Sequence, residues 1–285
     1  MINLIDLKQL LSLEKKNDNH FIGKNYKTEW GRVFGGQVLG QSLHAAYQTV
    51  PEDRIAHSMH GYFILGGDIN VPINYHVDNI RDGKSFTTRR VIAYQKGKAI
   101  FIMAASFQLN QEGVNHQINM PNVLTPDLLL TDLQQAINLK KIDSERYEKI
   151  LKSHPKVFEF KPVEKATFLQ TRNSLPKSHV WFKTKEKVNA KISFQHQLLA
   201  FASDYSLLLT STLPHREKLF GKKIFYASLD HAIWFHRQFK IDDWLLYSMQ
   251  SPSASNSRGF TLGSIFNLAG EMVASVSQEG LIRTY

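Results

Sequence analysis

The stretch Leu198-Leu199-Ala200-Phe201-Ala202-Ser203-Asp204-Tyr205-Ser206-Leu207-Leu208 determines how the rest of the chain must be arranged. It is apolar almost all round, which predicts a helix over residues 194–209 that is buried on every side. One carboxylate, Asp204, interrupts the apolar surface. Because a buried, unpaired carboxylate is costly, Asp204 must either have hydrogen-bonding partners or be kept for chemistry.

The composition limits the class of protein. The chain has 285 residues, of which 42% are hydrophobic and 21% charged, as in a soluble globular protein of one or two domains. It has no cysteine, so disulfides, thiolate catalysis and Cys-based zinc sites are excluded. We expect a cytoplasmic location, because the N-terminus lacks a signal-peptide pattern. We expect no membrane span, because the longest apolar run, residues 99–107, is too short.

The chain is basic, with a formal net charge of +10. This charge favours anionic partners such as nucleic acid, a membrane surface or a phosphorylated small molecule. The basic residues are scattered, however, with short clusters at residues 183–187 and 216–223. Because no Arg-rich helix, RNA-binding motif or zinc finger is present, we expect no nucleic-acid partner.

The spacing of apolar residues predicts a helix followed by an antiparallel meander, and predicts this order twice. In the first half, Gly35-Gly36 begins a helix that runs through residues 37–46. A short amphipathic helix is expected over residues 3–13, a first strand over 26–30, and surface helices between 125 and 151. The remaining expected strands cover residues 57–65, 73–80, 85–95, 99–109, 159–164, 179–183, 223–230, 233–237, 244–250, 259–267 and 271–281.

The two halves also correspond weakly in sequence. Gln37-Val38-Leu39 matches Gln197-Leu198-Leu199, and two later pairs of short matches keep the same order, as a duplicated domain would. A curved sheet can bury an all-apolar helix on its concave face. We therefore predict an α+β fold, a tandem or double hotdog, in which each half is a long central helix wrapped by a curved antiparallel sheet. The expected division is an N-terminal hotdog at 1–110, a linker with surface helices at 111–157, and a C-terminal hotdog at 158–285.

Five stretches together resemble those of the bacterial acyl-CoA thioesterase II, or TesB-type, family, and the resemblance runs from about Leu10 to Ile282. The stretches are Arg32-Val33-Phe34-Gly35-Gly36-Gln37-Val38-Leu39-Gly40-Gln41, Phe201-Ala202-Ser203-Asp204, Leu229-Asp230-His231-Ala232-Ile233-Trp234-Phe235-His236-Arg237, Ser251-Pro252-Ser253-Ala254-Ser255-Asn256-Ser257-Arg258-Gly259-Phe260 and Val276-Ser277-Gln278-Glu279-Gly280. The resemblance implies hydrolysis of medium- to long-chain acyl-CoA to free fatty acid and CoA, without a cofactor. It also implies assembly into a homo-oligomer, a dimer or tetramer.

By the same resemblance, the catalytic residues are Asp204, Ser228 and Gln278. Thioester hydrolysis needs an aimed water and a group that takes its proton, and Asp204 is the candidate base. Ser228 would orient Asp204 or the water. The absence of a Gly-x-Ser-x-Gly elbow argues against Ser228 as an acylated nucleophile. The amide of Gln278 can donate and accept, so it can aim a water.

Other residues are candidates for binding. The glycines Gly35 and Gly36 can bring backbone N–H groups close to a thioester carbonyl, or can serve only the turn. Arg258 and the lysine clusters near residues 183 and 222 can bind the CoA phosphates, or can simply be solvated. One departure from the family is visible in the run Tyr62-Phe63-Ile64-Leu65-Gly66-Gly67-Asp68, where the family usually carries Arg-Pro after Tyr-Phe.

Two expectations concern histidines. His44 is the counterpart of Asp204 in the first half by the match of Gln37 to Gln197, so only one of the two halves should be active. No metal site is expected, because the pairs His57 and His60, and His231 and His236, have odd separations along strands and so face opposite sides.

Two other functions remain open from the residues. The chain could be a hotdog enoyl-CoA hydratase or dehydratase, although that chemistry usually employs a histidine and none lies close to Asp204 in sequence. It could also be a non-catalytic acyl-CoA-binding protein.

Overall fold

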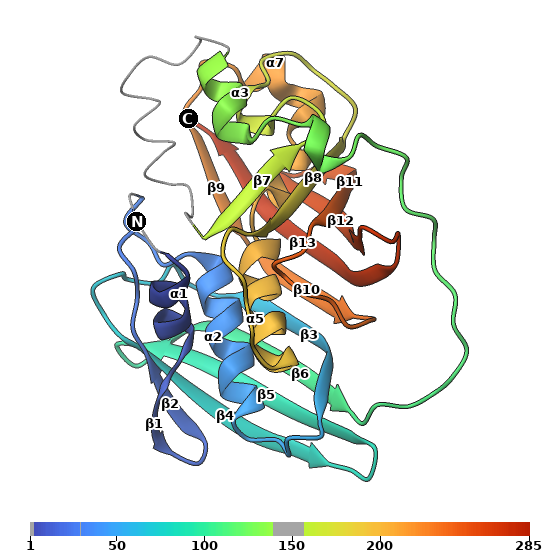
Figure 1. The fold of residues 1–285 in the computed structure, drawn as a ribbon. Coiled ribbons are helices and arrows are strands. Elements are labelled where there is room, and N and C mark those ends of the chain that lie inside the picture. The colour runs from blue at the N-terminus through green and yellow to red at the C-terminus, as the bar shows by residue number, and fades with distance from the viewer. Residues whose placement is uncertain (1–2, 29, 139–156) are drawn as a thin grey trace.

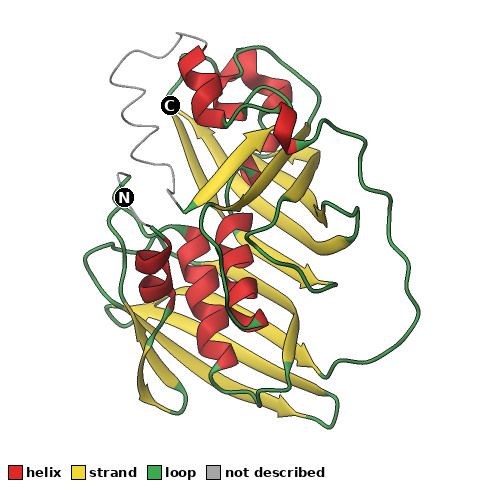
Figure 2. Cartoon of the chain, viewed as in Figure 1, coloured by secondary structure: helices red, strands yellow, loops and turns green. Residues whose placement is uncertain are grey.

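The fold is an antiparallel sheet wrapped around two long helices. The computed structural model describes residues 3–28, 30–138 and 157–285. In these ranges 13 strands form one continuous sheet, and the long helices α2, Gly35–Tyr47, and α5, Ile192–Ser203, lie side by side against it (Figure 1; Figure 2). Since each half contributes one such helix and one meander, the predicted double hotdog is confirmed.

The strands follow two meanders that join edge to edge. The first half contributes β1 Glu14–Asn17, β2 His20–Gly23, β3 Ile55–Phe63, β4 Ile73–Asp82, β5 Phe86–Gln95 and β6 Lys98–Gln108. The second contributes β7 Phe158–Pro162, β8 Lys177–Thr184, β9 Ile224–Ser228, β10 Asp230–Phe235, β11 Leu245–Ser255, β12 Arg258–Asn267 and β13 Met272–Thr284. The order across the sheet is β1-β2-β4-β5-β6-β3-β10-β13-β12-β11-β8-β7, with β9 also paired to β13. The pairing of β3 with β10 therefore joins the two halves.

The shorter helices lie outside this framework. They are α1 Leu4–Leu11, which packs against α2, together with η1 Pro126–Leu128, α3 Asp132–Asn138, η2 Thr167–Leu169, α6 Leu207–Thr210, η3 Leu213–His215 and α7 Arg216–Leu219. None of the helices in the described ranges is long and apolar enough to cross a membrane.

The hydrophobic core is shared by the two halves. One cluster contains Leu39 and Leu43 of α2, Leu199 of α5, and inward-facing strand residues such as Val91 and Val276. Burying the apolar surface of both helices in the same cluster is the main stabilising contribution. The division of the chain at residues 110 and 157 into separate units stays a prediction.

The helix α5 ends earlier than the sequence predicts. Residues 195–203 are all buried, as expected, but the helix stops at Ser203 and Asp204 is its C-cap. Ser206 adopts a left-handed conformation with φ +66°, after which α6 begins. A left-handed residue cannot continue a right-handed helix, so the predicted end at residue 209 is wrong.

Two other predicted elements need correction. No strand forms in residues 24–28, and the first strands are instead β1 and β2. All four residues of β1 are exposed, so its sequence carries no alternation of buried and exposed positions. The helix expected from Thr125 is only a single turn, η1, followed by α3, and the rest of that prediction up to Leu151 lies largely outside the described residues.

The two central helices run antiparallel and approach closely where glycines face a carbonyl. A Cβ on Gly36 would lie 2.3 Å from the carbonyl oxygen of Phe201, and one on Gly40 would lie 3.2 Å from that of Gln197. Because backbone atoms cannot move aside as a flexible side chain does, these positions set the distance between the helices.

We expect Gly36→Ala to lower the free energy of unfolding by about 2 kcal/mol, because the cost of overpacking exceeds the helix propensity that alanine adds. Gly113→Ala is the control, since a Cβ there meets no atom within 4 Å. Urea unfolding monitored by circular dichroism gives both values. Equal midpoints for the two variants would show that the helices do not depend on this contact.

Candidate active site

The amino end of α2 meets the carboxyl end of α5. The residue before α2, Phe34, gives its helix no side-chain cap. Asp204 fills this role from the other half of the chain, because its Oδ2 accepts a hydrogen bond of 2.9 Å from the N–H of Gly36. A carboxylate satisfies the unpaired N–H groups at a helix start and interacts favourably with the helix dipole.

The second oxygen of the same carboxylate has partners from two strands. Gln278 Nε2 donates to Asp204 Oδ1 at 2.8 Å, and Ser228 Oγ lies 3.4 Å from the same oxygen. Gln278 Nε2 also donates to Ser228 Oγ at 2.8 Å. The structure thus brings together the three residues that the family resemblance implied, from the end of α5, the end of β9 and the middle of β13.

The strand β13 positions two of these side chains by pairing with β9 and β10 at once. Gly280 is opposite Ser228, and Ser277 is opposite Ala232. Leu229 lies between β9 and β10 and donates its N–H to the carbonyl of Glu279. Because alternate residues of a strand face the same side, Gln278 and Gly280 are both buried against the helices.

The environment of Asp204 sets its acidity. Burial raises the pKa of this carboxyl group from 3.8 to about 6, while the hydrogen bonds from Gln278, Gly36 and Ser228 act in the opposite direction. The residue is only half-buried, so solvent can reach it. The site also contains an unpaired hydrogen-bond acceptor, because the Oε1 of Gln278 is buried without a partner within the described residues.

The two glycines serve close packing in this structure. A Cβ on Gly35 would lie 2.6 Å from Asp204 Oδ2 and 3.1 Å from the ring of Phe63. The N–H of Gly36 is already bonded to Asp204. The N–H of Gly35 has no partner within the described residues. Contact of either glycine with a thioester carbonyl stays a prediction.

The residues expected to bind the CoA phosphates make no hydrogen bond to the three candidate catalytic residues. Arg258 Nε donates to Glu279 Oε1 at 2.9 Å, and both side chains are partly exposed. The Lys183 ammonium lies 5.0 Å from the ring centroid of Trp244. Neither residue hydrogen-bonds to Asp204, Ser228 or Gln278, so their role in binding CoA stays a prediction.

The run that departs from the family pattern lies against the start of the site. The carbonyl of Gly67 accepts a hydrogen bond of 2.9 Å from the N–H of Val33, two residues before Gly35. Asp68 forms an isolated bridge with Arg32, and the Arg32 guanidinium lies 4.6 Å from the ring centroid of Phe225. A change in this loop therefore acts directly on the segment that leads into α2.

Several residues near the carboxylate were not found by sequence reasoning. Phe34 packs against Phe201 and Tyr205, and these rings form an apolar wall beside Asp204. His231 is fully buried, and its Nε2 lies 2.9 Å from Ser203 Oγ. His231 stands in the Leu-Asp-His run quoted for the resemblance, and that position was the only signal available.

The first-half counterpart of Asp204 is not His44. Asp204 is the C-cap of α5, and the matching end of α2 is formed by its last residue, Tyr47, and its C-cap, Gln48. His44 lies one turn earlier, with its Nδ1 3.3 Å from Gln197 Oε1. The weak match of Gln37 to Gln197 is therefore shifted by about one helical turn, and that shift produced the wrong pair.

No group of three or more His, Asp or Glu side chains in the described ranges is arranged to hold a metal ion. The sequence contains no cysteine that could add a ligand.

Comparison with known proteins identifies relatives over the whole chain. Residues 154–281 match the family model described as acyl-CoA thioesterase, and residues 26–108 match the acyl-CoA thioesterase N-terminal domain. Acyl-CoA thioesterase 2 of Haemophilus influenzae is 39% identical, with 98% of each chain covered. A crystal structure of an acyl-CoA thioesterase II from Mycobacterium marinum has 37% identity and a TM-score of 0.79, and 98% of each chain is covered. A hotdog-fold protein of unknown function from Alicyclobacillus acidocaldarius shares the fold at 14% identity and a TM-score of 0.77, over 97% of each chain.

The raised pKa of Asp204 makes stability depend on pH. Between 3.8 and about 6 the folded protein binds more protons than the unfolded chain, so the free energy of unfolding falls as pH rises. Asp204→Asn removes this dependence. We therefore compare the free energy of unfolding of the variant with that of the wild type at pH 4 and at pH 7. Relative to the wild type, the variant should be more stable at pH 7 than at pH 4 by about 2 to 3 kcal/mol. Urea unfolding at the two pH values measures it, and a constant difference would contradict the raised pKa.

Proposed function

Because this chain belongs to the acyl-CoA thioesterase family and hydrolyses acyl-CoA thioesters, we propose that Asp204 activates the water that attacks the thioester carbonyl. The observation that carries the proposal is a half-buried carboxylate that is fixed through both oxygens and has a pKa of about 6. A general base works best when its pKa lies near the working pH. At neutral pH most Asp204 is ionised and ready to accept a proton.

The hydrogen-bonding partners of Asp204 position its carboxylate. Gln278 Nε2 and the N–H of Gly36 hold the carboxylate, and the hydroxyl of Ser228 donates to it. The half-buried carboxylate can accept a hydrogen of the water, and Gln278 fixes the direction in which the carboxylate does so. A water held in this way presents a lone pair to the substrate carbonyl.

The reaction then proceeds without a covalent enzyme intermediate. The water oxygen bonds to the carbonyl carbon, and its proton passes to Asp204. The negative oxygen that develops lies at the amino end of α2, where the free N–H of Gly35 and the helix dipole stabilise it. When the C–S bond breaks, the CoA sulfur takes the proton from Asp204, and the products are free fatty acid and CoA.

Attack by Ser228 itself is disfavoured. Its oxygen accepts a hydrogen bond from the Gln278 amide, and it stands at the end of β9 without a nucleophile elbow. A hydratase or dehydratase mechanism lacks support as well, because no histidine hydrogen-bonds to Asp204 in the described part of the chain. The nearby His231 is bonded to Ser203 instead.

Removing the base should remove hydrolysis. We expect Asp204→Asn to lower kcat for palmitoyl-CoA by about 10³-fold, and Ser228→Ala and Gln278→Ala to lower it by about 10-fold to 100-fold. In the wild type, kcat/KM should rise with pH and reach half its plateau near pH 6, the pKa of Asp204. Release of free thiol gives the rates.

Asp78→Asn is the matched control, because this carboxylate pairs with Arg90 on the exposed face of β4 and β5. It should retain wild-type activity. Hydrolysis by Asp204→Asn at the rate of this control would overturn the mechanism.

We propose medium- to long-chain acyl groups as substrates, with the chain directed past Tyr205. Tyr205 follows Asp204 and hydrogen-bonds to Tyr26, which is largely buried. Tyr26 in turn lines a pocket of about 830 Å³ whose apolar residues include Leu10, Leu13 and Ile22. This volume lies within the range of about 300 to 1,000 Å³ that is usual for ligand pockets.

A larger side chain in this pocket should shorten the preferred substrate. We expect Leu13→Trp to lower kcat/KM for palmitoyl-CoA by about tenfold and to leave hexanoyl-CoA within about twofold, since lost burial of the distal chain affects only the longer substrate. Leu128→Trp, at an exposed position, is the control. An equal effect on both substrates would place the acyl chain elsewhere.

We also propose that the protein is a homo-oligomer, a dimer or tetramer, located in the cytoplasm. The outer face of the sheet exposes Tyr62, Ile102 and Leu262, and Tyr62 is opposite Ile102 in the pairing of β3 with β6. Exposed apolar side chains on one face favour sheet packing between copies. The absence of cysteine suits a reducing compartment.

A further inference from the structure

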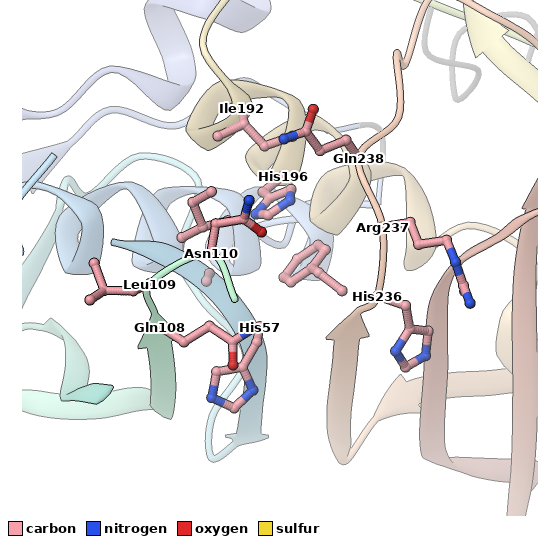
Figure 3. A pocket seen from close by; sticks show the side chains of 12 residues that line it. His57, Gln108, Leu109, Asn110, Ile192, His196, His236, Arg237 and Gln238 are labelled. Carbon is pink, nitrogen blue, oxygen red and sulfur yellow. The ribbon is translucent and has the colours of Figure 1, made fainter. Parts of the chain in front are cut away.

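The two central helices have a second pair of ends, and a pocket lies there. Because α2 and α5 run antiparallel, the start of α5 meets the end of α2 in the same way as the start of α2 meets the end of α5. The pocket has a volume of about 290 Å³. Its lining comes from the start of β3, the residues around the end of β6, the first turns of α5 and the end of β10 (Figure 3).

A buried histidine at this pocket has one free ring nitrogen. His196 is 2% exposed, and its ring stacks on Phe235 with centroids 4.0 Å apart and planes 8° apart. Its Nδ1 lies 2.9 Å from the hydroxyl oxygen of Tyr47. Its Nε2 has no partner within the described residues, and the side chain lines the pocket.

The hydrogen-bond pattern decides which ring nitrogen carries the proton. The N–H of Ala56 donates to the hydroxyl oxygen of Tyr47 at 2.9 Å. Within the described residues, His196 Nδ1 is the one acceptor within reach of the Tyr47 hydroxyl hydrogen, and a buried hydroxyl requires an acceptor, so Tyr47 donates to His196 Nδ1. Burial lowers the pKa of His196 to about 3, so its ring is neutral. A neutral ring that accepts at Nδ1 carries its hydrogen on Nε2. The pocket therefore contains a fixed, unpaired N–H donor.

The rest of the lining suits an apolar chain with a carbonyl. Ile55, Leu109 and Ile192 supply apolar surface, and the amides of Gln108, Asn110 and Gln238 also line the pocket. The guanidinium of Arg237, another lining residue (Figure 3), is engaged by the carbonyl of Met272 and the side chain of Asn115. The other two histidines of the lining are already engaged, because His57 lies 2.8 Å from Ser106 Oγ and His236 lies 2.9 Å from Ser275 Oγ.

The pocket lacks the groups that hydrolysis needs. The matching end of α2 carries Tyr47 and Gln48 and no carboxylate, and none is among the lining residues of the pocket. A neutral histidine whose Nε2 is protonated cannot take a proton from water there, since its other nitrogen is engaged by Tyr47. A ligand bound here remains intact.

We propose that this pocket is a second, non-hydrolytic ligand site that binds the carbonyl oxygen of an acyl group through the Nε2–H of His196. The class of ligand is an acyl carbonyl attached to an apolar chain, either the thioester of an acyl-CoA or the carboxylate of a free fatty acid. The similar placement of the hydrolytic site, also at the junction of a helix start and a helix end, supports this class. The proposal goes beyond the hydrolytic function and does not depend on the role of Asp204.

The test is calorimetric titration of the full wild-type chain with two probes. One is a ketone analogue of decanoyl-CoA, in which a methylene separates sulfur from the carbonyl and prevents hydrolysis. The other is decanoate. We expect at least one of the two probes to bind with a stoichiometry of two molecules per chain. A second site for the analogue identifies acyl-CoA as the ligand, and a second site for decanoate alone identifies the fatty acid.

Two variants locate the second site. Ile192→Trp fills the pocket from the first residue of α5 and should reduce the stoichiometry to one while thioester hydrolysis stays at the wild-type rate. His196→Phe keeps the stack on Phe235 but removes the donor, and should weaken the second site about tenfold. One site per chain for both probes, or two sites that Ile192→Trp does not change, would overturn the proposal.

A measurement on the wild type avoids dependence on how the variants fold. With ¹⁵N-labelled histidine, the Nε2–H resonance of His196 should shift when the probe that occupies the second site is added. An unchanged resonance at saturating concentrations of both probes would also overturn the proposal.

Discussion

The hydrogen bond between the N–H of Gly36 and the carboxylate of Asp204 connects the two halves of the chain where the start of α2 meets the end of α5. It satisfies a helix start that has no cap of its own, and it stabilises a carboxylate in a site where burial alone would favour its neutral form. Both effects require the helices to approach within backbone contact distance. Glycine at positions 35 and 36 allows that approach, because a Cβ at either would collide with Asp204 or Phe201. The geometry of the carboxylate is therefore inseparable from helix packing.

Burial and hydrogen bonding act on the pKa of Asp204 in opposite directions, and their balance leaves this carboxyl group with a pKa of about 6. If the hydrogen bonds from Gly36, Gln278 and Ser228 dominated, the pKa would fall below its ordinary value and the carboxylate would be a weak base. If burial dominated without them, the group would be neutral at pH 7 and could not accept a proton. The donors come from α2, β9 and β13, so the balance depends on the pairing of β13 with β9 and on the contact of α2 with α5.

The sequence predicted most elements because the buried faces follow simple periods. The alternation in β4 and β5 and the apolar surface of α5 are direct consequences of burial in one core. The strand β1 and the end of α5 were missed for local reasons, since β1 is exposed on both faces and the left-handed Ser206 has no apolar signature. The grouping of Asp204, Ser228 and Gln278 came from family resemblance. Their separations of 24, 50 and 74 residues follow no period that sequence reasoning can use.

Duplication placed the same two helix ends at both junctions, yet the side chains there have diverged. At one junction a carboxylate accepts the helix N–H, and at the other Tyr47 accepts an N–H from β3 and engages a histidine of α5. Tyr47 is neutral, so it fills buried space without the desolvation cost that Asp204 incurs. A protein with two buried carboxylates would bear this cost twice in one shared core. Retaining a single buried carboxylate, with neutral hydrogen bonds at the other junction, keeps the framework of both junctions while confining the desolvation cost to the junction that contains Asp204.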